Sequence, residues 1–99
     1  MKIKMNKDKC ESLSETREKI DAIDNDLIAL IAQRQFYVDQ AMRFKSSVQD
    51  VQSPERVEQV IAHVRAKALI QDVDADLVEK IYREMIQHFI QRELKELRP

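Results

Sequence analysis

The chain of 99 residues contains no glycine and no tryptophan, and its only prolines are Pro54 and Pro99. P-loops, dinucleotide-binding fingerprints and nucleophile elbows all require glycine, so the sequence excludes those three kinds of site. Tight hairpin turns need residues with positive φ, which glycine supplies most readily. The composition therefore favours helices over β-hairpins, and we expect an all-α fold.

Metal-binding and membrane-spanning signals are also missing. Cys10 is the only cysteine, which argues against a disulfide framework or a thiolate metal cluster, and His63 and His88 lack metal-ligand spacing. No apolar run approaches the ~20 residues of a membrane span, and a net charge of −1 gives no general attraction to nucleic acid. The basic residues 1–9 lack the apolar core of a signal peptide. We expect a cytoplasmic protein with no metal, no cofactor, no membrane contact and no nucleic-acid partner.

Apolar residues at steps of three and four predict three helices. The first begins near Ser12 or Ser14, with Ser14 as the candidate N-cap, and runs to about Lys45. After a polar loop at 46–53, the second helix covers about 54–68, with Ser53 as N-cap and Pro54 as its first residue. A linker at 71–74 leads to the third helix at about 75–97. We expect residues 1–11 to form a disordered leader and residues 12–99 a single helical domain.

The length of the first helix predicts a dimer. Roughly 33 residues of helix extend ~50 Å, which exceeds the diameter of a small domain. The two shorter helices of one chain cannot cover the apolar stripe of such a helix. We expect the uncovered stripe to pack against a second copy, most simply about a two-fold axis.

Cations on the helical faces are the candidate functional residues. Arg34 and Lys45 are eleven residues apart, so a continuous helix would place both on one face, ~16 Å apart along its axis. Cations in an apolar seam are costly unless an anion meets them. Arg17 lies ~25 Å from Arg34 along the same helix, so it can join such a site only from a partner chain. Arg56 is a further cation, and Glu93 is expected to face inward near the end of the third helix.

These residues, in this order and spacing, resemble the all-helical chorismate mutases over roughly residues 13–97. The features are Arg17 followed by Ile-Asp-x-Ile-Asp at 20–24, then Arg34, Lys45, Pro-Glu-Arg at 54–56, and Glu93 seven residues after Ile86. No single feature is specific, but the ordered set is strong. Segments 43–46 and 53–57 and the short charged leader are most similar to the isochorismate–pyruvate lyase branch.

The resemblance implies an intertwined homodimer with the chorismate mutase type II fold and two equivalent pockets for a dicarboxylate. Arg34, Lys45 and Arg56 would come from one chain and Arg17 from the other. The reaction would be pericyclic, with Lys45 and Glu93 as the catalytic residues and Lys45 stabilising negative charge on the breaking ether oxygen. The substrate-binding residues would be Arg17, Arg34, Lys45, Arg56, Val57, Phe89 and Glu93.

Two residues depart from the usual chorismate mutase pattern. Val57 stands where typical members carry a glutamate that helps to bind the ring hydroxyl of chorismate, and isochorismate carries its hydroxyl elsewhere on the ring. An unpaired buried hydroxyl costs ~1–3 kcal/mol, enough to tilt the preference toward isochorismate. Glu93 stands where most relatives have glutamine, and a glutamate can donate to the ether oxygen only when it is protonated. We expect activity that rises as the pH falls below neutral.

We therefore expect an isochorismate pyruvate-lyase that forms salicylate, with or without a weak chorismate mutase activity. One alternative is a chorismate mutase that converts chorismate to prephenate, since it shares every cation. The other alternative is a dimeric helical interaction module without catalysis, for which Arg34 would be dispensable.

Overall fold

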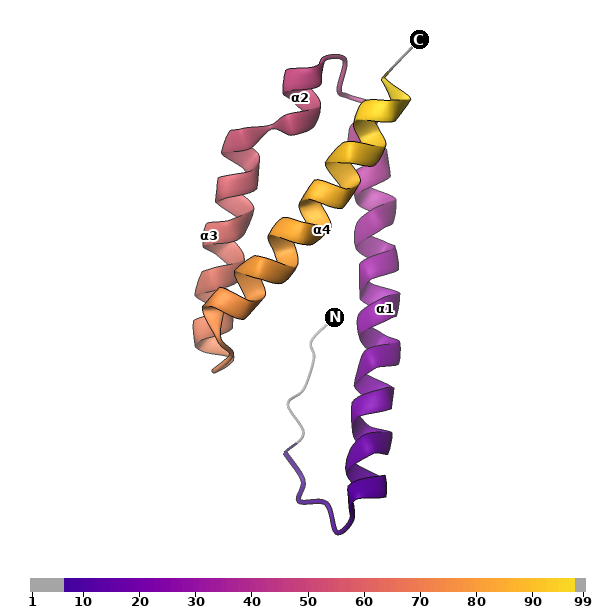
Figure 1. Cartoon of the computed structure of the whole chain (residues 1–99), viewed down its shortest axis with the longest axis vertical. Helices are drawn as coiled ribbons and strands as arrows, with labels where there is room; N and C mark the ends of the chain where they lie inside the picture. Colours follow the sequence, from indigo (N-terminus) through magenta and orange to yellow (C-terminus); the bar gives the residue numbers. More distant parts are fainter. Residues whose placement is uncertain (1–6, 98–99) are drawn as a thin grey trace. The chain divides into compact units, whose positions relative to one another are not determined.

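The computed structural model describes residues 7–97, and every regular element in that part of the chain is a helix (Figure 1). The helices are α1 (Leu13–Met42), α2 (Val48–Gln52), α3 (Pro54–Ile70) and α4 (Ala75–Glu96). The chain divides into two compact units, Met1–Asp39 and Gln40–Pro99, and the boundary falls within the last turn of α1. The all-α prediction is confirmed, with three long helices at the expected places and one short helix that was not predicted. Residues 1–6 of the predicted leader lie outside the described residues, and the single-domain assignment stays a prediction.

The start of α1 is fixed by reciprocal bonds that resemble a capping box. The Ser12 hydroxyl accepts a hydrogen bond from the Glu15 backbone N–H at 3.0 Å, and the Glu15 carboxylate accepts one from the N–H of Glu11, the residue before the cap, at 3.0 Å. The first bond satisfies a backbone donor that the first turn of a helix leaves open. Ser12 is therefore the N-cap, and the assignment of Ser14 was wrong. Ser12-x-x-Glu15 is itself the standard sequence pattern for this cap.

The end of α1 differs from the prediction. The helix stops at Met42, and Arg43, Phe44 and Lys45 follow in a tighter turn whose N–H groups bond to carbonyls three residues earlier, at 3.2, 3.0 and 3.1 Å. This tightening satisfies the last carbonyls of a helix that has no glycine after it to adopt a left-handed cap. Lys45 consequently lies beyond the helix, so the inference that it shares a helical face with Arg34 does not hold.

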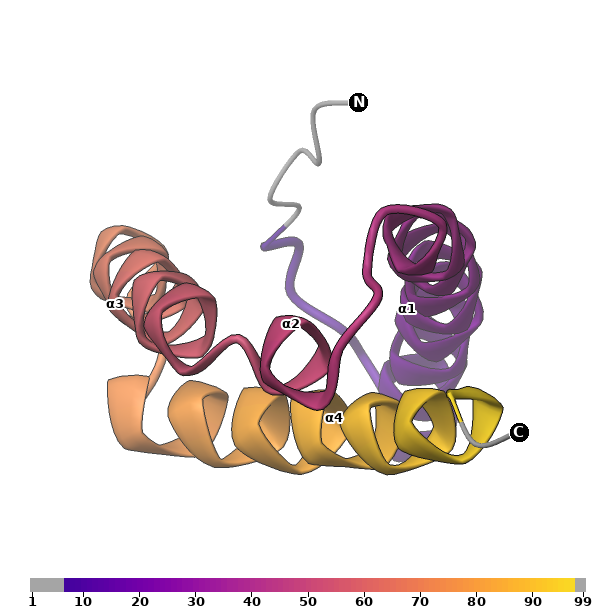
Figure 2. The same cartoon turned by 90° about the horizontal axis from the view of Figure 1, so that it is seen from above.

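The predicted loop at 46–53 contains the short helix α2. Ser47 caps it, because its hydroxyl accepts from the Asp50 N–H at 3.0 Å. Val51 is 1% exposed, and α2 packs on α4, as the view from above shows (Figure 2). A five-residue helix is not stable alone, so the burial of Val51 is what retains it.

Helix α3 begins at Pro54 as predicted, but Ser53 does not cap it with its side chain. Ser53 has φ 37° and ψ 60°, in the left-handed region, because it also ends α2. Its hydroxyl donates to the carbonyl of Asp50, and its own carbonyl accepts from the Val57 N–H at 3.0 Å. The side chain is thus already engaged with the preceding helix.

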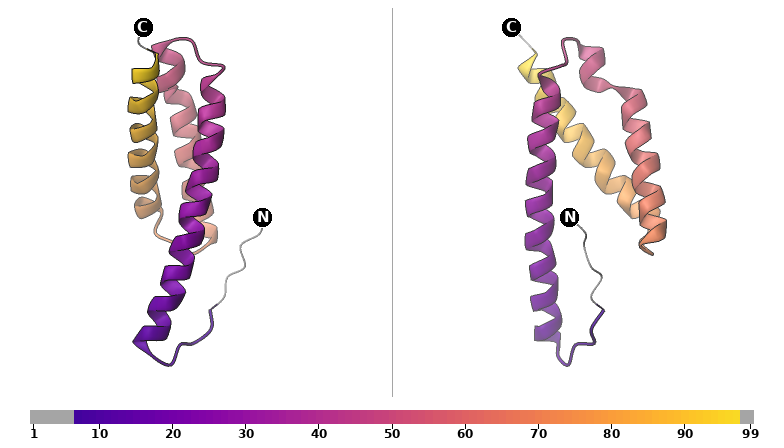
Figure 3. Two further views of the ribbon diagram at one scale, coloured as in Figure 1. Left: turned by 90° about the vertical axis from the view of Figure 1, so that its right-hand side faces the viewer. Right: turned by 180° about the vertical axis from the view of Figure 1, so that it is seen from behind.

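The α3–α4 turn is a Schellman motif without glycine. Asp72 has φ 60°, and the Val73 N–H donates to the Ala68 carbonyl at 2.9 Å. An aspartate tolerates this left-handed conformation better than most residues. The carboxylate of Asp74 then accepts from the Asp76 N–H at 2.9 Å and caps α4. Helices α3 and α4 meet at this turn and open away from it (Figure 3).

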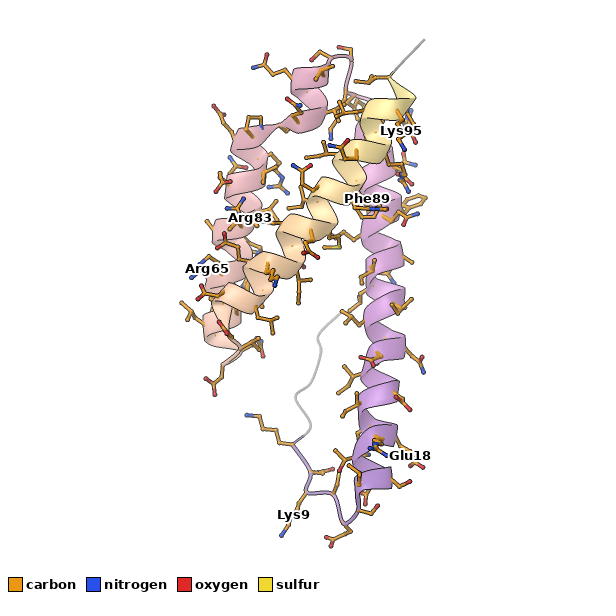
Figure 4. All side chains as sticks on the ribbon, viewed as in Figure 1. Lys9, Glu18, Arg65, Arg83, Phe89 and Lys95 are labelled. Atoms are coloured by element: carbon orange, nitrogen blue, oxygen red, sulfur yellow. The ribbon has the colours of Figure 1, made fainter. Side chains whose placement is uncertain are left out.

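An ion-pair network on the surface links α3 to α4. Arg83 binds both carboxylate oxygens of Glu58 at 3.0 Å and one oxygen of Glu79 at 2.7 Å. Arg65 binds Glu79 at 2.8 Å and Asp76 at 2.9 Å, and Figure 4 labels both arginines. The bonds from Arg83 hold the pKa of Glu58 and of Glu79 below the ordinary value. These acids are therefore ionised near neutral pH and committed to the arginines.

Candidate active site

Lys45 and Glu93, two of the predicted site residues, form an ion pair. Lys45 Nζ lies 3.4 Å from Glu93 Oε2. Lys45 is placed by the tight turn after α1, and Glu93 lies in the last turns of α4. The sequence predicted that Glu93 faces inward, and its side chain is buried.

Glu93 is the most unusual group in the described chain. It is 2% exposed and is the single charged residue among the buried residues of 7–97. Its second carboxyl oxygen, Oε1, has no hydrogen-bond partner among the described residues. Burying a carboxylate costs several kcal/mol unless a cation or hydrogen-bond donor meets it, and Lys45 supplies one such group. The second oxygen is left able to bond to something else.

Phe89 is a buried aromatic residue one helical turn before Glu93. It lies four residues before Glu93, on the same face of α4, and it is buried. The Arg92 guanidinium lies 5.0 Å from the centre of its ring, and His88 meets that ring edge-on at 5.6 Å. Figure 4 labels Phe89 on α4. Sequence reasoning missed Arg92, although a cation three residues after an inward aromatic lies on the same side of a helix.

Arg56 and Val57 lie in the first turn of α3, in the same unit as Lys45 and Glu93. Val57 is half-buried and Arg56 is exposed. Within 7–97, no hydrogen bond or ion pair joins Arg56 to Lys45 or to Glu93. The assignment of Arg56 to the substrate therefore stays a prediction.

Arg17 and Arg34 both lie on α1, in the unit that ends at Asp39. Arg17 is exposed and Arg34 is half-buried. The helix is continuous between them, so their Cα atoms are ~25 Å apart along its axis and the two side chains cannot meet from one chain. That Arg17 of one chain lies beside Arg34 of a second chain stays a prediction.

Other kinds of site find no support in the described part of the molecule. Residues 7–97 contain no group of three or more His, Cys, Asp or Glu side chains that could hold a metal ion. His63 and His88 are exposed, and Cys10 is half-buried near the start of the described chain. Among the same residues, no helix has the length and apolar character to cross a membrane.

The chain belongs to the chorismate mutase type II family, whose pattern it matches over residues 16–94. It is 34% identical to the isochorismate pyruvate lyase of Pseudomonas aeruginosa over 86 residues, which are 87% of this chain and 85% of the relative. It is 32% identical to the chorismate mutase of Methanocaldococcus jannaschii over 79 residues, which are 79% of this chain and 80% of the relative. The chain is thus a pericyclic enzyme of this family, which sets aside the non-catalytic helical module.

A thermodynamic cycle tests the Lys45–Glu93 pair independently of catalysis. Lys45→Met should lower the free energy of unfolding by about 1–3 kcal/mol, because it leaves the Glu93 carboxylate buried without a cation. Glu93→Gln in the same chain should remove most of that loss, giving a coupling energy of about 0.5–3 kcal/mol. Urea unfolding of the four proteins at equal concentration measures both quantities.

Lys95→Met is the matched control, since Lys95 is exposed near the end of α4 (Figure 4). It should change the stability by no more than about 0.5 kcal/mol. If the Lys45 and Glu93 effects simply add, the two groups do not form a stabilising pair.

Proposed function

We propose that the protein is an isochorismate pyruvate-lyase that converts isochorismate to pyruvate and salicylate. The observation that carries this choice is Val57, a half-buried apolar side chain in the first turn of α3. A carboxylate at this position would bind the ring hydroxyl of chorismate. Because valine cannot accept a hydrogen bond, the ring hydroxyl of chorismate has no partner at this position. Isochorismate carries its hydroxyl elsewhere on the ring, so its binding is not weakened.

The neighbouring acid cannot replace the missing carboxylate. Glu58 follows Val57, but both of its oxygens accept from Arg83 on α4 at 3.0 Å. Turning it toward a substrate would break a bidentate charge-assisted pair. The likeness to the lyase of Pseudomonas aeruginosa adds support for the same choice.

In the proposed reaction no covalent intermediate with the protein forms. The bond between the enolpyruvyl ether oxygen and the ring breaks while a ring hydrogen moves to the departing side chain, which leaves as pyruvate. Negative charge develops on the ether oxygen, and Lys45 stabilises it. Glu93, which forms an ion pair with Lys45 in the single chain, would have to carry a proton in the reaction to donate a second hydrogen bond to that oxygen. Arg17, Arg34 and Arg56 bind the substrate carboxylates, and Phe89 lies against the ring.

We further propose that the active enzyme is a homodimer. No residue of α1 is buried in the single chain, and its large apolar side chains at the N-terminal half are 50–65% exposed: Leu13, Ile20, Ile23, Leu27 and Ile28. An apolar stripe of this length on one helix is typical of a surface that packs against another chain. The second copy would also supply Arg17 to the pocket that contains Arg34.

The alternative is chorismate mutase activity, in which a carbon–carbon bond forms and prephenate results. The same cations serve that reaction, and the likeness to the chorismate mutase of Methanocaldococcus jannaschii favours keeping it as the second candidate.

Product analysis distinguishes the two activities. With isochorismate we expect salicylate and pyruvate in equal amounts. With chorismate we expect a kcat/KM for prephenate that is about 5- to 150-fold lower, since one missing hydrogen bond is worth ~1–3 kcal/mol. Prephenate formation that exceeds salicylate formation at equal substrate concentration would contradict the lyase assignment.

Val57→Glu tests the residue on which the choice depends. It should raise the chorismate mutase kcat/KM and lower the lyase kcat/KM. Val60→Glu, also half-buried on α3 but a turn further along, is the control for the burial of a charge, and it should raise neither activity.

Mixing two inactive variants tests the shared pocket. Arg17→Ala and Arg34→Ala should each abolish turnover while the helical circular dichroism is retained. If each pocket takes Arg17 from one chain and Arg34 from the other, a mixed dimer contains one intact pocket, and an equal mixture should recover about a quarter of the wild-type activity. Recovery requires exchange of chains, so the variants are unfolded and refolded together.

No recovery after joint refolding would contradict a pocket that takes Arg17 from one chain and Arg34 from the other. The control is the mixture of Arg34→Ala with Arg34→Lys, in which no dimer has both wild-type arginines in one pocket.

Glu93→Gln tests the donor role of residue 93. A glutamine amide donates at every pH, whereas a glutamate donates to the ether oxygen only when it carries a proton, so the variant should be more active than the wild type at pH 7. The measurement is kcat at pH 7, and lower activity in the variant would contradict the donor role.

A further inference from the structure

The backbone on either side of Lys45 is held in two different ways. On the N-terminal side, the Lys45 N–H bonds to the Met42 carbonyl at 3.1 Å, so the residue is attached to the last turn of α1. On the C-terminal side, Ser46 has no helix to continue into, because α2 starts only at Val48. Whatever fixes Ser46 therefore limits the positions that Lys45 can adopt.

The carboxylate of Asp50 fixes Ser46. Asp50 Oδ2 accepts from the Ser46 backbone N–H at 3.1 Å and from the Ser46 hydroxyl at 3.4 Å. In return the Asp50 N–H donates to the Ser47 hydroxyl at 3.0 Å. These bonds form a reciprocal cap at the start of α2. They also lower the pKa of the Asp50 carboxyl from its ordinary value, so the acceptor is ionised throughout the neutral range.

The cap is anchored to the rest of the unit through Val51. This residue follows Asp50 directly and is buried, on the short helix that packs against α4. Both partners of the Lys45–Glu93 pair are therefore attached to α4. Glu93 is part of that helix, and Lys45 is linked to it through Ser46, Asp50 and Val51. A side chain as long as lysine places its ammonium reproducibly only when its backbone is fixed.

We propose that Asp50 is a positioning residue for Lys45: its carboxylate holds Ser46 to the start of α2 and so keeps the Lys45 ammonium beside Glu93 before substrate binds. The inference rests on the catalytic role of Lys45 in the proposed function. The new element is that one exposed acid outside the pocket, Asp50, keeps the backbone of residues 45–47 in a fixed conformation.

Asp50→Ala, Asp50→Asn and Gln49→Ala test the proposal. Gln49 is the matched control, because its side chain is exposed on the same short helix one residue earlier. Asp50→Ala should lower kcat about tenfold with little change in KM, since a displaced Lys45 loses contact mainly with the charge that develops in the transition state. Asp50→Asn retains an oxygen that can accept from the Ser46 N–H, and it should recover most of the loss. Gln49→Ala should match the wild type.

Hydrogen exchange of the ligand-free protein gives a readout that does not depend on the reaction. Asp50→Ala should speed exchange of the Ser46 amide at least about tenfold, while amides in the centre of α3 keep their wild-type rates. If the protein proves to have a different substrate, this result still stands or falls by itself. A wild-type kcat in Asp50→Ala, an unchanged Ser46 amide, or an Asp50→Asn variant as impaired as Asp50→Ala would each overturn the proposal.

Discussion

The buried carboxyl group of Glu93 is the constraint around which the described site is organised. Glu93 is 2% exposed and its cation lies 3.4 Å away, so contact with bulk solvent is too small to compensate for a misplaced partner. The cation must therefore arrive at one place, although Lys45 comes from beyond the end of a helix. The tight turn after Met42 and the cap built by Asp50 together meet this requirement. Local backbone bonds, more than side-chain packing, define the position of the Lys45 ammonium.

The charges of the second unit fall into two groups with separate tasks. Arg65 and Arg83 neutralise the acids that face each other across α3 and α4, and their hydrogen bonds hold the pKa of Glu58 and Glu79 below the ordinary value. Because these acids are already paired, they do not compete for Lys45. Exposed pairs of this kind contribute little to stability one by one. Their larger effect is on chemistry: they keep carboxylates away from a site whose proposed substrate carries two of its own.

Periodicity predicted the interiors of the helices well and their ends less well. The positions of α3 and α4 and the inward direction of Glu93 follow from steps of three, four and seven residues. The end of α1 was placed three residues too late, because a turn with bonds between residues i and i−3 has almost the same apolar pattern as a helix. Helix α2 escaped detection, since Val51 is its one buried residue and a single residue has no period. The available sequence signal for this helix was the N-cap pattern Ser47-x-x-Asp50. The same polar residues are common in loops, so the pattern alone does not identify a helix.

The absence of glycine has its main structural consequence at the two ends of α3. Ser53 and Asp72 both adopt positive φ, a conformation that costs about 1–2 kcal/mol for a residue with a side chain. The hydrogen bonds on either side stabilise this conformation at both residues. Ser53 ends α2 where α3 begins, and Asp72 lies in the Schellman turn that leads into α4. Both turns have fewer alternative conformations than glycine would allow. The first turn of α3, which carries Arg56 and Val57, is therefore set by a restricted backbone. The proposed role of Val57, to distinguish two isomeric substrates, requires such a fixed position. A pocket wall that could move freely would bring another group to the hydroxyl that, in the proposal, Val57 leaves unpaired.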